Sequence, residues 1–170
     1  MMKKILFFTL LFVTALAVGA QNTVTAFIWD NDLTTNIRNS PKGKVVMSVS
    51  ADEPYVFELS TPRNGWWRIE TFYNPANYDE DTSLEGSSTG EYWIHSSVVA
   101  VSSRNYGGED IYLRDAPDED ANIVAVFNEE VIFKPLDVVG DWVKVKLDNT
   151  EIVGWIEKEW LCDNPLTTCS

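Results

Sequence analysis

A repeated series of motifs constrains the fold of this 170-residue chain more than any other feature. The segment Arg38-Asn-Ser-Pro41 matches Arg114-Asp-Ala-Pro117, and each arginine is followed 28 residues later by a tryptophan. Those tryptophans begin Trp66-Trp67-Arg68-Ile69 and Trp142-Val143-Lys144-Val145. Equal spacings between matching motifs are hard to obtain by accident, so we infer two copies of one unit.

A third pair of motifs, Tyr92-Trp93-Ile94 and Gly154-Trp155-Ile156, completes each copy. The distance from the first tryptophan to this motif's tryptophan is 27 residues in the first copy and 13 in the second. The first copy therefore contains an insertion of about 14 residues, which we place near 73–90. The insertion is polar and acidic, and we expect a hairpin extension or a loop.

Each copy reads as a string of short β-strands rich in β-branched and aromatic residues and separated by turn formers. Strands are expected at 45–47, 55–59, 66–72, 123–127, 131–136, 142–147 and 153–156. Alternation within the strand at 142–147 places Lys144 and Lys146 on one face and Val143, Val145 and Leu147 on the other. No segment after the first twenty residues has helical periodicity, so the pattern predicts small barrels or a sandwich.

The order of these motifs resembles the bacterial Src-homology-3-like (SH3b) domain. In the second copy the matching segments are Ile111-Tyr-Leu-Arg114, Gly140-Asp-Trp-Val-Lys-Val145, Val153-Gly-Trp-Ile156 and Trp160-Leu161. In the first copy they are Thr35-Asn-Ile-Arg38, Gly65-Trp-Trp-Arg-Ile69 and Tyr92-Trp-Ile-His-Ser-Ser97. The resemblance implies an all-β fold of two tandem small barrels with five to six strands each, and a non-catalytic binding role at the cell envelope. The chain departs from the family in its insertion and in Tyr92, which stands where the second copy has glycine.

The first twenty residues read as a secretory signal peptide. Lys3 and Lys4 precede an apolar stretch from Ile5 to Val18, and Val18-Gly19-Ala20 forms a small-residue cleavage site. A membrane anchor is the alternative, but the stretch of about 14 residues is shorter than the roughly 18 that a span needs. We therefore predict export to the periplasm or beyond, with no membrane span after cleavage. The predicted parts are a signal at 1–20, a first barrel at 22–101, a second at 102–162 and a tail at 163–170.

Two cysteines, Cys162 and Cys169, flank a short segment with turn chemistry at the C-terminus. In an exported protein they are expected to form a disulfide that closes the tail. A nucleophilic cysteine is the alternative, but it would need a histidine partner, and the only one, His95, is far away in the sequence. Their spacing is not a redox or zinc signature.

Charge and composition exclude several classes of function. Without its first twenty residues the chain holds 11 basic and 26 acidic side chains, a charge of −15. This balance argues against binding to nucleic acid or to anionic lipid. The single histidine, without nucleophile-elbow glycines around it, leaves little for a catalytic triad or a metal site. We expect neither enzymatic activity nor a cofactor.

Two acidic segments raise the question of calcium binding. Asp79, Glu80 and Asp81 lie in the insertion, and Asp30-Asn-Asp32 lies near the start of the first copy. Calcium prefers several carboxylate and carbonyl oxygens, but neither segment has the spacing of a calcium-binding loop. Solvated acidic turns are the simpler interpretation of both.

Aromatic residues are the best candidates for ligand binding. Trp66 and Trp67 are adjacent on one strand and must point to opposite faces, so one can enter the core while the other is exposed, or covered by the insertion or by the other barrel. An exposed indole can bind sugar rings or peptide side chains. The candidate ligand-binding residues are Trp66, Trp67, Tyr73, Trp93 and Trp142. The alternative is that these aromatic residues fill two small cores and the interface between them.

Two functions therefore stay open. The first is an exported binding module for a cell-envelope component, either a peptidoglycan peptide or glycan or an envelope protein. The second is an interaction scaffold with rigidly packed barrels and no small-molecule ligand. The connection at 102–108 is short, so we expect the copies to touch and to be able to share a cleft.

Overall fold

The computed structural model describes residues 22–76, 91–104, 107–162 and 166, and in these residues the all-β prediction is confirmed. They form strands and two short 3₁₀ turns, with no α-helix among them. The strands of the first half are β1 (Thr23–Ile28), β2 (Thr34–Arg38), β3 (Val45–Ser50), β4 (Val56–Arg63), β5 (Trp66–Tyr73), β6 (Tyr92–His95) and β7 (Val99–Ser103). Those of the second half are β8 (Ile111–Arg114), β9 (Ile123–Phe127), β10 (Ile132–Val139), β11 (Trp142–Leu147), β12 (Val153–Glu157) and β13 (Leu161–Cys162). The 3₁₀ turns are η1 (Ser96–Val98) and η2 (Lys158–Trp160).

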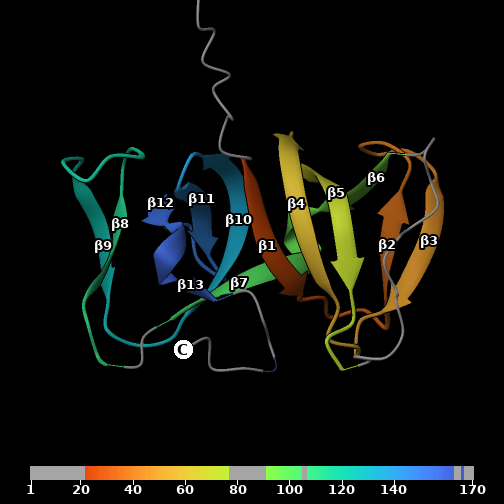
Figure 1. Cartoon of the computed structure of the whole chain (residues 1–170), viewed down its shortest axis with the longest axis horizontal. Helices are drawn as coiled ribbons and strands as arrows, with labels where there is room; N and C mark the ends of the chain where they lie inside the picture. The colour runs from red at the N-terminus through yellow and green to blue at the C-terminus, as the bar shows by residue number, and fades with distance from the viewer. Residues whose placement is uncertain (1–21, 77–90, 105–106, 163–165, 167–170) are drawn as a thin grey trace, which may run out of the picture.

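The strands of both halves are hydrogen-bonded into one continuous antiparallel sheet. Its order is β3-β2-β6-β5-β4-β1-β7-β10-β11-β12-β8-β9, with β13 added on β7. Figure 1 shows the strands of the first half at one end of the molecule, those of the second half at the other, and β1 and β7 between them. The two halves are therefore joined by backbone hydrogen bonds as well as by the chain.

Strand β7 makes this connection. Val99 and Ala100 pair with β1, Val101 and Ser102 pair with β10, and Ser102 and Ser103 pair with β13. All five residues of β7 are buried. The boundary predicted between residues 101 and 102 lies inside this strand, and the assignment of two domains stays a prediction.

The repeated motifs occupy matching places in the sheet. Arg38 pairs with Trp93 on β6, and Arg114 pairs with Trp155 on β12. Each arginine also donates a hydrogen bond from Nη1 to a carbonyl oxygen of the turn that follows it. The acceptors are Gly43 at 2.7 Å and Ala121 at 2.9 Å. The arginine of each motif thus connects its strand to its own turn.

One hydrophobic core runs through both halves. Phe57 and Trp67 of the first half and Phe133 of the second are fully buried members of the same cluster. The indole Nε1 of Trp67 donates a hydrogen bond of 3.0 Å to the carbonyl oxygen of Pro135 on β10. Gly154 permits close packing in the second half, because a Cβ atom there would lie 2.8 Å from the Cβ of Leu113.

Several predicted features lie outside the described residues. These are the signal peptide, Asp79, Glu80 and Asp81 of the insertion, and Cys169. Cys162 is buried on β13, and its bridge to Cys169 stays a prediction. Among the residues that the structure describes, no helix is long and apolar enough to cross a membrane.

Candidate functional site

Trp66 and Trp67, the first two predicted ligand-binding residues, are both buried. Trp67 is 0% exposed and Trp66 is 9% exposed. The guanidinium of Arg38 lies 5.8 Å from the centre of the Trp66 ring, and the His95 ring meets it edge-on at 5.0 Å. Of the alternatives left open for the outward-facing indole, exposure does not occur, because Arg38 of β2 and His95 of β6 cover Trp66.

The other three predicted residues lie in different surroundings. Trp93 is 2% exposed, donates from Nε1 to Glu91 at 3.2 Å, and has the guanidinium of Arg63 5.6 Å from its ring centre. Tyr73 is exposed at the far end of β5 from Trp66, and Trp142 is half-buried on β11. The structure thus brings Trp66 and Trp93 together on adjacent strands, but not Tyr73 or Trp142. A ligand-binding role for any of the five stays a prediction.

His95 caps the turn η1. Its Nδ1 accepts a hydrogen bond of 3.2 Å from the backbone N–H of Ser97 and lies 2.8 Å from the Ser97 hydroxyl. An Nδ1 that accepts from an amide must carry no proton, which favours the neutral ring. Burial, assisted by the charge of Lys42, lowers the pKa of His95 below its ordinary value of 6.5.

We expect the single imidazole of the protein to titrate below pH 6.5 in an NMR experiment, because folding disfavours its charged form. By linkage, the stability that this group contributes is present above pH 6.5 and is lost as the pH falls through its lower folded pKa. Replacing Lys42 with alanine should raise the midpoint, while the matched change Lys144→Ala should leave it in place. A midpoint at or above 6.5 in the parent protein would contradict this assignment.

A hollow of the described surface lies where the two halves meet, and we call it the junction cleft. It consists of two adjoining cavities of about 470 and 540 Å³, which share Ser97, Lys134, Asp148 and Asn149. The first half contributes the turn between β1 and β2 and the turn η1, and the second contributes β10 and the turn after β11. The cleft therefore needs both halves of the chain.

Trp29 presents an exposed indole in this cleft. Its side chain is 45% exposed, yet its Nε1 donates a hydrogen bond of 3.1 Å to Oδ2 of Asp148 in the other half. Phe27 supports the ring edge-on, with 6.2 Å between the ring centres. The indole is thus held in one orientation while much of its surface stays open to a ligand.

Lys134 occupies the middle of the cleft but is engaged with the backbone. Its Nζ donates to the carbonyl oxygens of Trp29 at 3.1 Å and Ser97 at 2.9 Å. Burial lowers the pKa of Lys134, and the carboxylates of Asp148 and Asp30 partly oppose this effect. This ammonium group lines both cavities and connects the second half to the first.

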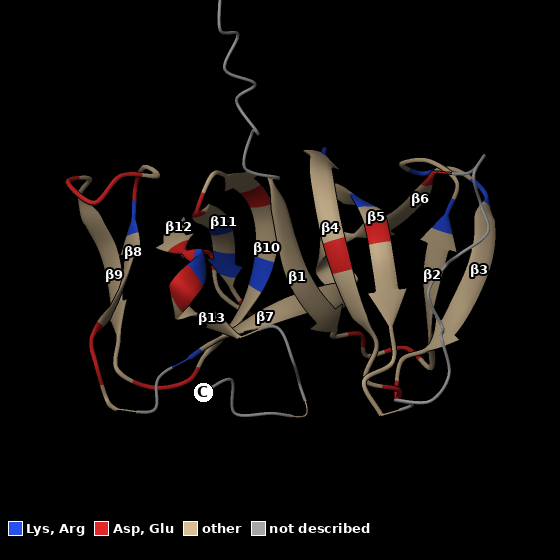
Figure 2. Ribbon diagram, in the orientation of Figure 1, with Lys and Arg blue, Asp and Glu red and all other residues tan. Residues whose placement is uncertain are grey.

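Carboxylates dominate the rest of the cleft. Asp30 accepts from the Thr35 hydroxyl at 2.8 Å and from the Asp32 amide at 3.1 Å, so its position is fixed. Asp32 and Asp148 also line the cavity. Acidic residues occupy many of the loops of the molecule (Figure 2). Within the described residues no group of three His, Cys, Asp or Glu side chains is arranged to hold a metal ion.

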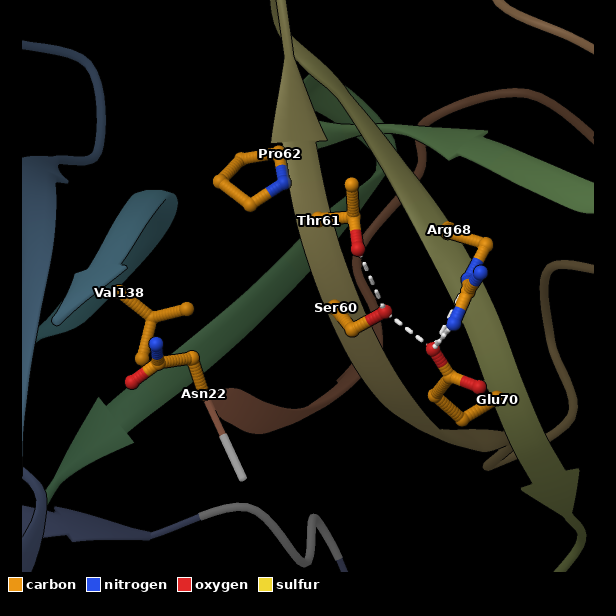
Figure 3. Close-up of a pocket in the computed structure, with 7 residues that line it drawn as sticks. All are labelled: Asn22, Ser60, Thr61, Pro62, Arg68, Glu70 and Val138. Atoms are coloured by element: carbon orange, nitrogen blue, oxygen red, sulfur yellow. Dashed lines mark hydrogen bonds and ion pairs between the residues drawn. The ribbon is translucent and has the colours of Figure 1, made fainter. Parts of the chain in front are cut away.

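A smaller hollow of about 350 Å³ lies between β4, β5 and β10 (Figure 3). Its polar side chains bind one another. Arg68 donates from Nε to Glu70 at 2.9 Å, and Ser60 donates to the same carboxylate oxygen. Burial raises the pKa of Glu70, but hydrogen bonds from Ser60 and Arg68 outweigh it and hold the pKa below its ordinary value. This internal network makes the hollow a poorer ligand site than the junction cleft.

Analysis of the sequence missed Trp29 as a site residue. The signal was present, because a tryptophan directly before the turn formers Asp30-Asn-Asp32 is placed at the end of a strand, where an aromatic side chain is easily exposed. From the sequence, that segment was interpreted only as a solvated acidic turn or a set of calcium ligands. The partner that orients Trp29 is Asp148, which lies 119 positions along the chain.

Comparison with known proteins identifies a family for the second half. Residues 109–161 match the family model of the bacterial SH3 domain. The chain is similar at 10% identity to two solved structures, NlpC1 and NlpC2 from Trichomonas vaginalis, each with a TM-score of 0.32. These matches cover 88% and 84% of this chain, and 50% and 48% of the two NlpC chains, so the chain spans about half their length. No curated protein matches the sequence.

Proposed function

We propose, on the match of residues 109–161 to the bacterial SH3 domain, that the protein is an exported, non-catalytic module that binds a component of the cell envelope. Its ligand in this proposal is a cell-wall peptide carrying a free amino group, bound in the junction cleft. In this proposal nucleic acid is not a partner, because the charge of −15 that the chain carries without its first twenty residues repels a polyanion.

The observation that carries this proposal is the exposed indole of Trp29, hydrogen-bonded to Asp148 at the meeting of the two halves. A rigid aromatic surface loses little conformational entropy on binding, which is why tryptophan is common among binding hot spots. The carboxylates of Asp30 and Asp32 lie beside it in the same cavity. An amino group of a peptide would meet carboxylates there, and its apolar part would lie on the indole.

The surroundings of His95 support a non-catalytic role. Both the amide and the hydroxyl of the neighbouring Ser97 are within hydrogen-bond distance of Nδ1, so the ring closes a turn. The His95 ring also meets the Trp66 ring edge-on, with 5.0 Å between the ring centres. These contacts give His95 a structural task and leave its Nδ1 occupied.

We also propose that the two halves are tandem copies of the same domain, which share β7. This strand pairs with β10 in the second half as β1 pairs with β4 in the first. In the first half, β7 is the last strand and pairs with β1. In the second half, β13 is the last strand and pairs with β7 in the equivalent way. The equivalent hydrogen bonds of Arg38 and Arg114 support the same proposal.

The test is the binding of soluble peptidoglycan fragments to the parent protein and to Trp29→Ala, measured by calorimetry. We expect Trp29→Ala to weaken binding at least about tenfold, the loss typical of an aromatic hot spot, while the protein stays folded and loses only a little thermal stability, because the hydrogen bond to Asp148 is exposed. Tyr73→Ala is the matched control, because Tyr73 is also an aromatic side chain with 45% exposure but lies outside the cleft. Acetylation of the amino groups of the fragments should weaken binding to the parent protein in the same way.

The same binding experiment distinguishes a peptide ligand in the cleft from a glycan ligand and from a protein that binds no fragment. Equal binding of Trp29→Ala and the parent protein would contradict the cleft, and a loss with Tyr73→Ala instead would favour the aromatic residues predicted from the sequence. Binding that survives acetylation but requires the sugar strand would make the ligand a glycan. If the parent protein binds no fragment, the scaffold function replaces the binding module, and the continuous core through Trp67 and Pro135 is the observation that favours it.

A further inference from the structure

Within the described residues, the two ends of the sheet are edge strands, β3 at one end and β9 at the other. β3 pairs only with β2, and β9 pairs only with β8, among the strands that the structure describes. An edge strand offers a row of backbone N–H and C=O groups to which another strand can add. The molecule therefore has two places, at opposite ends of its long axis, where a further strand could pair (Figure 1).

Both edge strands expose β-branched apolar side chains. Val45 and Val46 on β3 are 45% and 47% exposed. On β9, Ile123, Val124 and Val126 are 49%, 46% and 50% exposed. A single exposed valine is ordinary, but a run of them along an unpaired edge is the composition of a strand that docks on another.

The turns that precede these strands have opposite charge. Lys42 and Lys44 are exposed in the turn before β3, whereas Asp118, Glu119 and Asp120 are exposed in the turn before β9. Figure 2 shows the basic turn and the acidic turn on the same side of the molecule, at its two ends. The two turns follow Arg38 and Arg114, which have equivalent hydrogen bonds, so the same structural position is basic in one half and acidic in the other.

We propose that this protein associates end to end with further copies of itself, through β3 of one copy and β9 of the next. Moving one copy along the long axis of Figure 1 brings the acidic turn of one molecule to the basic turn of its neighbour. β3 and β9 both run away from these turns, so this arrangement pairs them in parallel. An antiparallel pairing would separate the opposite charges by about the length of a five-residue strand, roughly 17 Å, which exceeds the screening length of about 8 Å at physiological salt.

This contact joins two different surfaces, so it does not close after two copies. Heterologous contacts of this kind produce open chains unless a rotation closes them into a ring. The net charge of −13 opposes association of any two copies, so added salt weakens both the local attraction and the overall repulsion. Exchanging charges in the two turns separates the effects better than changing salt does.

The experiment is sedimentation velocity of the full chain over a range of concentrations at about 150 mM salt. For the parent protein we expect the weight-average sedimentation coefficient to rise continuously with concentration. K42E/K44E has two acidic ends and D118K/E119K/D120K has two basic ends, so each alone should lose this rise. An equimolar mixture of the two variants should recover it, because every contact in the mixture again joins opposite charges.

The matched control is E91K/D141K/E151K, which reverses three exposed acidic residues outside β3, β9 and the turns next to these strands, and it should associate at least as strongly as the parent protein. A folded variant is required, so circular dichroism is recorded for each, and the neutral changes K42Q/K44Q and D118N/E119Q/D120N replace any that unfolds; each should weaken association. Three results would each overturn the proposal: a parent protein that stays monomeric, single variants that associate like the parent, or a mixture that shows no recovery. A dimer that does not grow with concentration would overturn it as well.

Discussion

Trp67→Ala is expected to destabilise the whole protein by about 3–5 kcal/mol, the cost of removing a fully buried tryptophan. Trp67 is 0% exposed and is the largest of the fully buried side chains. The substitution also removes the donor that satisfies the carbonyl oxygen of Pro135 on β10. The loss should appear in urea unfolding as a lower midpoint.

Two further variants separate packing from the hydrogen bond. Trp67→Phe keeps much of the ring volume but removes Nε1, so its destabilisation should be smaller than that of alanine yet still measurable. Trp142→Ala, at the half-buried tryptophan on β11, is the control and should cost much less. A loss below about 1 kcal/mol for Trp67→Ala would show that the first and second halves do not depend on this contact.

Val101→Asp in the shared strand β7 is the second large expected effect. Val101 is 0% exposed and pairs with Phe133 of β10, which is also 0% exposed. A carboxylate without a partner at this position must either be buried with its charge or take up a proton, and each costs several kcal/mol. Because β7 also pairs with β1, we expect both halves to unfold at once.

The measurement is thermal unfolding followed by tryptophan fluorescence and by circular dichroism. In the parent protein the two transitions should coincide, and in Val101→Asp both should move together to lower temperature or disappear. Val139→Asp on β10 is the control, because it is the same change at a residue that is 49% exposed. If Val101→Asp left one half folded, with a separate transition, the two halves would be independent in stability despite their common sheet.

A shared strand affects how the protein can bind. The junction cleft is built from turns of both halves, and Lys134 and Trp29 connect them through hydrogen bonds across the cleft. A cleft between two rigidly joined parts keeps its shape without a ligand, which lowers the entropy that binding must overcome. The proposed site therefore depends on the hydrogen bonds that connect the two halves as much as on Trp29 itself.

Local features of the sequence predicted seven of the described strands, but not β1 or β7, which join the two halves. The expected strand at 142–147 coincides with β11, in which Val143 and Val145 are buried and Lys144 is less so. Alternation reports which side of a strand faces the core, because successive side chains point to opposite faces. The same rule correctly placed Trp66 and Trp67 on opposite faces of β5.

The partners of these side chains were decided only by the tertiary structure. Alternation could not tell that Arg38 and His95 cover Trp66, or that Asp148 holds Trp29 across 119 positions of sequence. Alternation also could not show that β7 pairs both with β1 of the first half and with β10 of the second. The residue pattern of one strand indicates which of its side chains are buried and where turns begin, over a few residues. Which strands pair with each other, and which side chains cover the outer face of the sheet, depends on packing between segments that are distant in the sequence. The sequence by itself thus determined the class of fold and its repeated motifs, and long-range packing determined the common sheet, the cleft and the exposed indole.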